Sequence, residues 1–339
     1  MKVSRVVVGA TVMALAAGCG GTGGETTTNA DGVELDVVTL TLNWYPYGEH
    51  APFYHGLEQG VFEEHGIDLR IQAGQGSQKT VQATTSGQTD FGWADTPAVL
   101  AGVAQGLDVT SVGVFLQTTP SSAQFFSDKE IESPDDLRGM TIASTAGDAL
   151  SATFPAFLEI NGIEADEVEL QNTDPAGKMA AVISGQTDAL LGFATDQGPT
   201  MQESADRDVS YLRFADHGLN FFSNGLITAS DNLTEREDLV RRMVTASSQA
   251  WAQAAEADPA EVVGAMSDAG EQLPSPEVLT EQFEATLELL HTEATEGMPP
   301  GVNTEEDWTT TIEIFAEAGV IETAEEPAAY WDASFAPEG

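Results

Sequence analysis

Aromatic and polar side chains that could bind a ring crowd one turn near the start of the chain. Asn43, Trp44, Tyr47 and His50 directly follow the apolar run of residues 37–42, and a proline and a glycine interrupt the pattern between them. A flat indole can stack on a heteroaromatic ring, and amide, phenol and imidazole groups exchange hydrogen bonds. The turn therefore predicts one wall of a small-molecule cleft. For Trp44 taken alone, packing in a hydrophobic core is the competing interpretation.

Further polar residues stand where strands are expected to give way to helices. Gln75-Gly76-Ser77 precedes one expected helix, Asp95 and Thr96 begin a second, and Gly147-Asp148 precedes a third. The first turn of a helix offers unpaired backbone N–H groups and the positive end of the helix dipole, which suit anionic or polar ligand groups. Gly76 would also let the backbone approach a ligand closely. A simple capping role is the alternative for Ser77 and Thr96.

Several known catalytic and metal-binding patterns are absent from the sequence. It contains no Gly-x-x-x-x-Gly-Lys-Ser/Thr phosphate loop, no Gly-x-Ser-x-Gly nucleophile turn and no His-Glu-x-x-His motif. His50 and His55 are five residues apart rather than four, which disfavours a zinc site. His50 could act as a general base, but no serine or cysteine nucleophile is paired with it. We therefore expect no catalytic residue, no metal and no cofactor.

These candidate residues need a scaffold, and the hydrophobic pattern predicts an α/β one. Apolar, strand-like runs are expected at residues 37–43, 67–73, 90–94 and 109–116, with helices at 51–64, 77–86 and 97–105 between them. Strand and helix in alternation predict a mostly parallel sheet with helices on both faces. Ligands bind to such sheets outside the carboxyl ends of the strands, which is where the candidate residues stand.

A second series of the same kind follows. Strands are expected at residues 140–144, 167–172, 189–193, 209–214 and 225–228, with helices at 148–160 and 174–184. The stretch Ser86-Gly-Gln-Thr-Asp90 recurs as Ser184-Gly-Gln-Thr-Asp188 at the same helix-to-strand position, which favours two lobes of related construction. From about residue 235 the chain becomes helical and acidic, with helices expected at 235–257, 259–268, 276–291 and 304–318.

The charge of the chain limits its partners. It has 12 lysines and arginines against 55 aspartates and glutamates, which gives a formal net charge of -43 at pH 7. Nucleic-acid binding requires clustered cations, so we exclude a nucleic-acid partner. A surface this acidic keeps a protein in solution and is similar to the surfaces of salt-adapted proteins.

The first residues have the pattern of an export signal. Lys2 and Arg5 precede an apolar run at residues 6–17 that is too short to span a bilayer, and small residues stand before Cys19, the sole cysteine. This pattern resembles the bacterial lipoprotein signal, which implies cleavage before Cys19 and lipidation of its thiol. A plain secretory signal is the alternative. We assign residues 1–18 to the signal peptide and residues 19–35 to a flexible, glycine- and threonine-rich tether, and we expect a protein anchored by lipid to the outer face of the cell membrane.

Several stretches resemble one group of bacterial substrate-binding proteins. Leu42-Asn-Trp-Tyr-Pro46 with His50, and then residues 60–68, look like the opening of that group, and residues 74–80, 86–96, 137–145, 174–192 and 220–228 extend the likeness. Members serve ABC importers for thiamine-pyrimidine precursors, sulfonates, nitrate and related compounds. The resemblance implies a type II periplasmic-binding-protein fold, an α/β architecture in which two lobes joined by two crossings close over a ligand.

The resemblance also implies how the chain is divided. The crossings would fall near residues 121–125 and 217–222. Lobe I would comprise residues 36–122 and 220–339, with the helical tail packed back on it, and lobe II would comprise residues 123–219. We expect a monomer that delivers its ligand to the transmembrane subunits of an ABC permease.

Within this group the class of ligand is open. The rings of Trp44, Tyr47 and Phe193 favour a flat ligand. Nearby aspartates could pair with amino groups on the ring of such a ligand and would repel a bare sulfonate. We favour an aromatic or pyrimidine-like solute of the thiamine-precursor class, and a sulfonate, taurine or nitrate-type anion is the alternative. The predicted ligand-binding residues are Asn43, Trp44, Tyr47, His50, Gln75, Gly76, Ser77, Asp95, Thr96, Thr118, Gly147, Asp148, Phe193, Asp196 and Asn220.

The opening stretch is also similar to a eukaryotic pyrimidine synthase of thiamine biosynthesis that shares this fold. The resemblance implies an enzyme that consumes its own histidine with pyridoxal phosphate and a cysteine-rich iron motif, and His50 would be that histidine. This chain has no cysteine beyond Cys19, so the iron motif is missing. We therefore expect His50 to contact the ligand or line the cleft wall, and a synthase-like enzyme using His50 is the second alternative.

Overall fold

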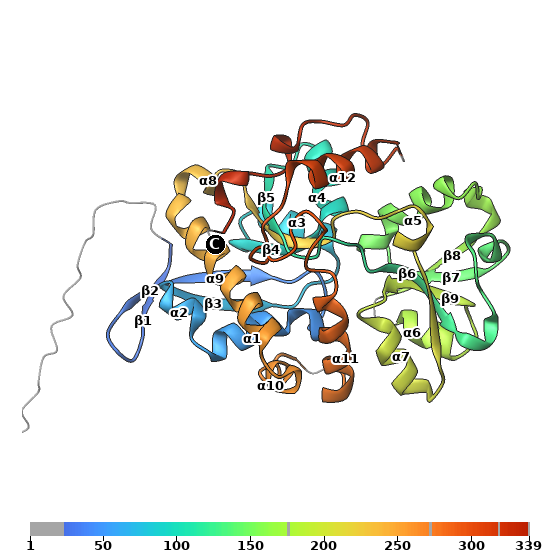
Figure 1. Cartoon of the computed structure of the whole chain (residues 1–339), viewed down its shortest axis with the longest axis horizontal. Helices are drawn as coiled ribbons and strands as arrows, with labels where there is room; N and C mark the ends of the chain where they lie inside the picture. Colours follow the sequence, from blue (N-terminus) through green and yellow to red (C-terminus); the bar gives the residue numbers. More distant parts are fainter. Residues whose placement is uncertain (1–23, 175–176, 271–272, 318, 338–339) are drawn as a thin grey trace, which may run out of the picture.

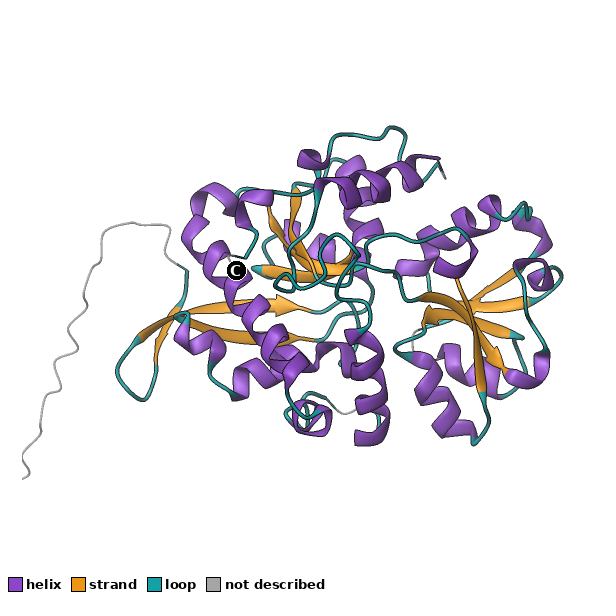
Figure 2. Cartoon of the chain, in the orientation of Figure 1, coloured by secondary structure: helices purple, strands orange, loops and turns teal. Residues whose placement is uncertain are grey.

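The chain folds into two α/β lobes that lie beside each other (Figure 1). The computed structural model describes residues 24–174, 177–270, 273–317 and 319–337. Lobe I contains a sheet built from the early strands and one late strand, and lobe II contains a second sheet within residues 121–213. Helices flank both sheets (Figure 2), so the expected α/β class is confirmed.

The sheet of lobe I is mixed. Its described strands run in the order β1-β2-β4-β11-β5, and β3 also pairs with β2. Strand β2 is parallel to β3 and β4, whereas β11 is antiparallel to β4 and β5. The strands are β1 (Thr26–Thr28), β2 (Glu34–Thr41), β3 (Ile67–Gln72), β4 (Phe91–Asp95), β5 (Val109–Val114) and β11 (Asn224–Ala229).

The sheet of lobe II is also mixed. Its described strands run in the order β10-β6-β9-β7-β8. Strand β7 is parallel to β8 and β9, and β6 is antiparallel to β9 and β10. The strands are β6 (Ser121–Phe126), β7 (Thr141–Ser144), β8 (Glu169–Asn172), β9 (Ala189–Phe193) and β10 (Val209–Arg213).

Helices cover the sheets and form the carboxyl-terminal part of the chain. Asp258 and Ser275 cap two of them, since their side chains accept hydrogen bonds from the N–H groups of Ala260 and Val278, with proline in the first turn. The helices are α1 (Ala51–Glu58), α2 (Val61–Glu64), α3 (Ser77–Thr85), α4 (Thr96–Ala104), α5 (Ala149–Ile160), α6 (Gly177–Ile183), α7 (Gln197–Ala205), α8 (Asn232–Glu235), α9 (Glu237–Glu256), α10 (Pro259–Gly264), α11 (Pro276–Leu287) and α12 (Glu305–Glu317). Short 3-10 turns include η1 (Gly48–His50), η3 (Pro134–Leu137) and η4 (Ala165–Glu167).

Two expectations about the connecting segments were wrong. Residues 121–125 do not form the first crossing, because they belong to the fully buried strand β6. The chain crosses between Val114 and Ser121 and returns between Arg213 and Asn224. Residues 26–35 are not a loose tether, because β1 pairs antiparallel with the start of β2. The proposed signal peptide and Cys19 lie outside the described residues.

Each lobe has its own aromatic core. In lobe I the rings of Trp93 and Trp251 stack with centroids 5.4 Å apart, which joins β4 to α9. In lobe II the rings of Phe157 and Phe214 stack at 4.1 Å, and Phe154 packs beside them. Such pairs stabilise a core through burial and ring geometry together.

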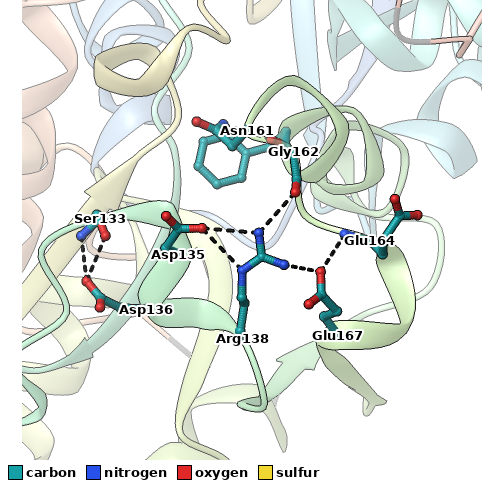
Figure 3. A network of polar contacts seen from close by, with 9 residues as sticks. Ser133, Asp135, Asp136, Arg138, Asn161, Gly162, Glu164 and Glu167 are labelled. Carbon is teal, nitrogen blue, oxygen red and sulfur yellow. Dashed lines mark hydrogen bonds and ion pairs between the residues drawn. The ribbon is translucent and has the colours of Figure 1, made fainter.

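A polar network holds one edge of lobe II (Figure 3). The Arg138 guanidinium donates to Asp135 Oδ1 at 3.2 Å, to the Gly162 carbonyl at 3.0 Å and to Glu167. It thereby joins η3, the end of α5 and η4. Asn161 beside it donates to the His217 carbonyl at 3.2 Å. The network therefore connects this edge to the segment that returns to lobe I.

Among the described residues, no helix is both long enough and apolar enough to span a bilayer.

We predict that Phe157→Ala destabilises the protein by about 3–5 kcal/mol, because it removes a buried ring from the lobe II core. Chemical denaturation followed by circular dichroism measures this change. Ile160→Ala, three residues further along the same helix, is the matched control, since Ile160 is 46% exposed. Equal losses for the two variants would contradict the packing described here.

Candidate ligand-binding site

A cavity lies between the two lobes. Its empty volume is about 320 Å³. From lobe I it is lined by Asn43, Trp44, Tyr47, Gly76 and Ser77, and from lobe II by Asp148, Leu150, Lys178, Gly192, Phe193, Asp196 and Gln197. Most of these residues follow the carboxyl ends of β2, β3, β7 and β9 or begin the next helix. The site therefore stands where open α/β sheets place their ligands.

His50 is locked in the wall of lobe I as a neutral ring. It has no exposed surface, and burial lowers its pKa to about 3. Its Nδ1 accepts a hydrogen bond from the Tyr47 backbone N–H at 3.3 Å, so the proton resides on Nε2, which donates to Asn43 Oδ1 at 2.8 Å. His50 thus orients the amide of Asn43, which lines the cavity. His50 itself is not among the lining residues.

Glu49 stands behind Tyr47 as a buried acid with three donors. It accepts hydrogen bonds from the Tyr47 hydroxyl, from Trp93 Nε1 at 2.6 Å and from Asn224 Nδ2 at 2.6 Å. Burial raises its pKa to about 7, although the three hydrogen bonds act in the opposite direction. Burial also raises the pKa of Tyr47 well above its usual value, and Glu49 adds to this effect. The Tyr47 hydroxyl therefore stays protonated.

Two further acids are buried in the same region. Burial raises the pKa of Asp95 to about 8, with a further rise from Glu49 and Asp148, while a hydrogen bond from Ser223 opposes it. Burial likewise raises the pKa of Asp196 to about 7, and the positive charge of Lys178 opposes that rise. Both carboxyl groups can therefore carry a proton near neutral pH.

Lys178 supplies positive charge at the cavity. Its ammonium group lies 2.9 Å from Asp148 Oδ2 and donates to the Leu191 carbonyl at 2.8 Å, and the two charged side chains are 2% and 6% exposed. The same nitrogen lies 5.2 Å from the centre of the Trp44 ring. Because Trp44 belongs to lobe I and Lys178 to lobe II, this cation–π contact spans the cleft.

The two lobes touch at a pair of glycines. A Cβ atom on Gly76 would lie 2.7 Å from the Gly147 carbonyl oxygen, and Gly76 has a φ of +119°. A side chain at Gly76 is therefore excluded both by the backbone conformation and by the opposite lobe.

The structure brings together eight of the predicted ligand-binding residues around the cavity: Asn43, Trp44, Tyr47, Gly76, Ser77, Asp148, Phe193 and Asp196. The other seven lie elsewhere.

Those seven residues fall into three groups. His50, Asp95 and Thr96 are buried in lobe I outside the lining, and the Thr96 hydroxyl donates to the Ser223 carbonyl. Gln75 is exposed, and Gly147 contacts Gly76. Thr118 and Asn220 lie on the two crossings, where Asn220 Oδ1 accepts a hydrogen bond from the Thr119 N–H at 3.3 Å.

Sequence reasoning missed four lining residues and one supporting residue. Leu150, Gly192 and Gln197 line the cavity beside predicted neighbours, and Lys178 lies in the helix that follows Asp174-Pro175. Glu49 sits inside the aromatic turn itself. Lysine is scarce in this acidic chain, so Lys178 could have been singled out from the sequence. The sequence does not show, however, that its side chain is buried.

No group of three or more histidine, cysteine, aspartate or glutamate side chains in the described part of the chain is arranged to hold a metal ion.

Residues 48–262 match the model of the family described as NMT1/THI5 like. The chain belongs to the NMT1/THI5-like family. The chain spans less than two thirds of the length of each of the two relatives described next. The chain is 24% identical over 212 residues to the formylaminopyrimidine-binding protein of Halalkalibacterium halodurans. This match covers 62% of this chain and 64% of that protein. It is 27% identical over 217 residues to the riboflavin-binding protein RibY of Chloroflexus aurantiacus, which covers 63% and 61% respectively.

Solved structures share the fold of this chain. The alkanesulfonate-binding protein SsuA from Xanthomonas axonopodis pv. citri, solved with MOPS, is 18% identical and superposes with a TM-score of 0.65 over 87% of this chain and 98% of that one. At this identity the likeness concerns the fold, so the periplasmic-binding-protein architecture expected from the sequence is confirmed.

We predict that Asp95→Asn weakens the pH dependence of stability. The folded protein retains a proton on Asp95 that the unfolded chain releases near pH ~3.9. The stability from this proton is complete below that unfolded pKa and is lost as the pH rises through about 8. Between pH 5 and pH 8, the fall in unfolding free energy should be less steep in the variant. The amide itself changes the unfolding free energy by the same amount at each pH. The slope of unfolding free energy against pH therefore reports only the protonation of Asp95.

Denaturation by urea at several pH values supplies that slope. Glu284→Gln, which removes an exposed acid on α11, is the control and should leave it unchanged. An identical slope for Asp95→Asn and the wild-type protein would contradict the proposed protonation.

We predict that Lys178→Met destabilises the protein by about 3–5 kcal/mol, because it removes the cation from a buried carboxylate. The double variant Lys178→Met/Asp148→Asn should regain part of this loss, since the charge left behind is then removed as well. Thermal and urea unfolding of both variants measure the difference. A single variant as stable as the wild type would rule out this role.

Proposed function

We propose that this protein is the extracytoplasmic solute-binding component of an ABC importer and captures a small aromatic or pyrimidine-like solute between its lobes. The observation that carries the proposal is the composition of the interlobe cavity. Rings of Trp44, Tyr47 and Phe193 and carboxyl groups of Asp148 and Asp196 line one space. Membership of the NMT1/THI5-like family and similarity to a formylaminopyrimidine-binding protein support the same ligand class.

The hydrogen-bonding groups of the cavity suit the edge of an aminopyrimidine. Such an edge presents an amino N–H donor beside a ring nitrogen acceptor. A carboxylic acid that carries a proton can donate to the ring nitrogen and accept from the amino group. Asp196, with a pKa of about 7, can fill this role near neutral pH. Asn43, held by His50, offers a second polar contact on the opposite wall.

The space inside the cavity favours a small solute. The empty space between the lining atoms, together with the part open to solvent, is about 320 Å³. A single substituted ring fits such a space more readily than the three fused rings and ribityl chain of riboflavin.

A sulfonate, taurine or nitrate-type anion is the second candidate, and Lys178 is the observation that favours it. That ammonium group is already paired with Asp148, so the two charges offset each other, and Asp196 adds negative charge only above its pKa of about 7. An incoming anion would therefore meet little net attraction near neutral pH and repulsion at higher pH. The synthase alternative has less support, because both ring nitrogens of His50 are engaged inside the wall and the chain has a single cysteine.

The remaining parts of the proposal concern location and partners. Lipidation at Cys19 would anchor the protein at the outer face of the membrane, and the permease subunits of the importer would receive the solute. The antiparallel pairing of β1 with β2 leaves a short segment between Cys19 and the folded body. The lobes would then be held close to the membrane surface, as a monomer.

The test is a binding panel on purified protein. We expect formylaminopyrimidine to raise the unfolding temperature and to give heat in calorimetry, whereas taurine, alkanesulfonates, nitrate and riboflavin give neither. A ligand at a hundredfold excess over Kd contributes about 2.7 kcal/mol to stability, which is easily measured. A response to the sulfonates alone would overturn the pyrimidine assignment, and conversion of the pyrimidine to a product would favour an enzyme.

Trp44→Ala should weaken binding of formylaminopyrimidine by about a hundredfold, because it removes the ring from the cavity wall. Trp44→Phe, which keeps a smaller flat ring, should show an intermediate affinity. Circular dichroism verifies that both variants are folded. Unchanged affinity in Trp44→Ala would remove stacking from the proposal.

A further inference from the structure

Helix α11 of the carboxyl-terminal region carries a buried amide at the contact between the lobes. Gln282 has no exposed surface. Its Oε1 accepts a hydrogen bond from the Gly48 N–H at 2.9 Å, and its Nε2 donates to the Asp196 carbonyl at 2.7 Å and to Thr200 Oγ1 at 3.3 Å. Both ends of one side chain are therefore occupied, by lobe I on one side and by lobe II on the other.

The helix itself is fixed to lobe I. A Cβ atom on Gly48 would lie 2.4 Å from the Leu279 carbonyl oxygen and 2.5 Å from Gln282 Cβ. The turn η1 and α11 thus pack without space for a side chain. Because η1 directly follows Tyr47, α11 holds the same turn that supplies the wall of the cavity.

The contacts of Gln282 with lobe II end at a residue of the cavity. Asp196 precedes α7, and its side chain lines the cavity while its carbonyl accepts from Gln282. In Figure 1, α11 and α7 lie at the part of the interlobe contact that is remote from the segments joining β5 to β6 and β10 to β11. A rotation about those segments would separate Gln282 from Asp196 and Thr200 and leave its bond to Gly48 intact.

We propose that Gln282 is a positioning residue that latches the lobes together and fixes Asp196 against the cavity in the closed state. An amide fits this place because it both donates and accepts while remaining uncharged at every pH. A carboxylate at the same position would keep the bond from Gly48 but would face the carbonyl of Asp196 with another acceptor. The proposal extends the proposed binding function, since a closed cavity that holds Asp196 in place retains its solute longer.

The test uses Gln282→Glu in the full chain, with Gln282→Met as a second variant that can neither donate nor accept a hydrogen bond through its side-chain end. Spin labels on Glu261→Cys in lobe I and Gln186→Cys in lobe II, both exposed positions, report the distance between the lobes after Cys19→Ser removes the native thiol. The matched control is Glu203→Ala. It breaks the hydrogen bond from Ser275 to Glu203, at 2.6 Å on the exposed rim, while Ser275 still caps α11.

We expect Gln282→Glu to shift the labels to longer distances at pH 8 and back toward the wild-type distance at pH 5, where the introduced acid can be protonated and donate. Gln282→Met should show the longer distance at both pH values, and Glu203→Ala should match the wild type. Affinity for formylaminopyrimidine should fall about tenfold in Gln282→Met. Wild-type distances in both Gln282 variants at pH 8 would overturn the latch.

The distance measurement needs no ligand. It therefore separates failure of the latch from failure of the proposed function. If the wild-type protein binds no pyrimidine but the Gln282 variants still show the longer distance, the latch stands and only the assignment of the solute fails.

Discussion

The burial of carboxyl groups at and behind the interlobe cavity is the constraint on which the rest of this structure depends. Asp148 and Asp196 are buried where they line the cavity, and Glu49 and Asp95 are buried in lobe I outside the lining. A buried carboxylate costs several kcal/mol unless donors, a cation or a proton offset the loss of hydration. This chain combines the three solutions: hydrogen bonds surround Glu49, Lys178 pairs with Asp148, and raised pKa values leave Asp95 and Asp196 able to keep protons. An amino edge of a ligand would supply further donors to the same acids.

The neutral groups of the site follow from the same constraint. His50 is held without charge because burial penalises its cation, and its fixed tautomer in turn orients Asn43. Gln282 satisfies a donor on one lobe and acceptors on the other without adding charge to an already acidic region. Close glycine contacts, such as Gly76 against Gly147, leave little room for water between the lobes. Low local dielectric then strengthens each remaining polar contact.

Much of the fold could be predicted from the sequence because its signals are local. Apolar runs located nearly all strands of both sheets, and the helices expected to begin at residues 259 and 276 begin there in the structure. Strand β6 escaped prediction because Ser-Ser-Ala-Gln-Phe-Phe is buried along its whole length and does not alternate. The pairing of β1 with β2 was also missed, since three threonines in a glycine-rich segment form a strand only when an edge is available to pair with.

By itself the sequence determined the α/β class, the aromatic turn after β2 and the cavity wall that this turn supplies, because strand ends and helix starts are set by neighbouring residues. Only the tertiary structure decided which of the chain's acids leave water and that His50 supports Asn43 from behind. It also decided that Lys178 of lobe II contacts Trp44 of lobe I, and that Gln282 of lobe I contacts Asp196 of lobe II. These outcomes depend on burial and on contacts between residues far apart in the chain. Local composition carries no record of either, since an aspartate on the surface and one in the cleft are the same letter.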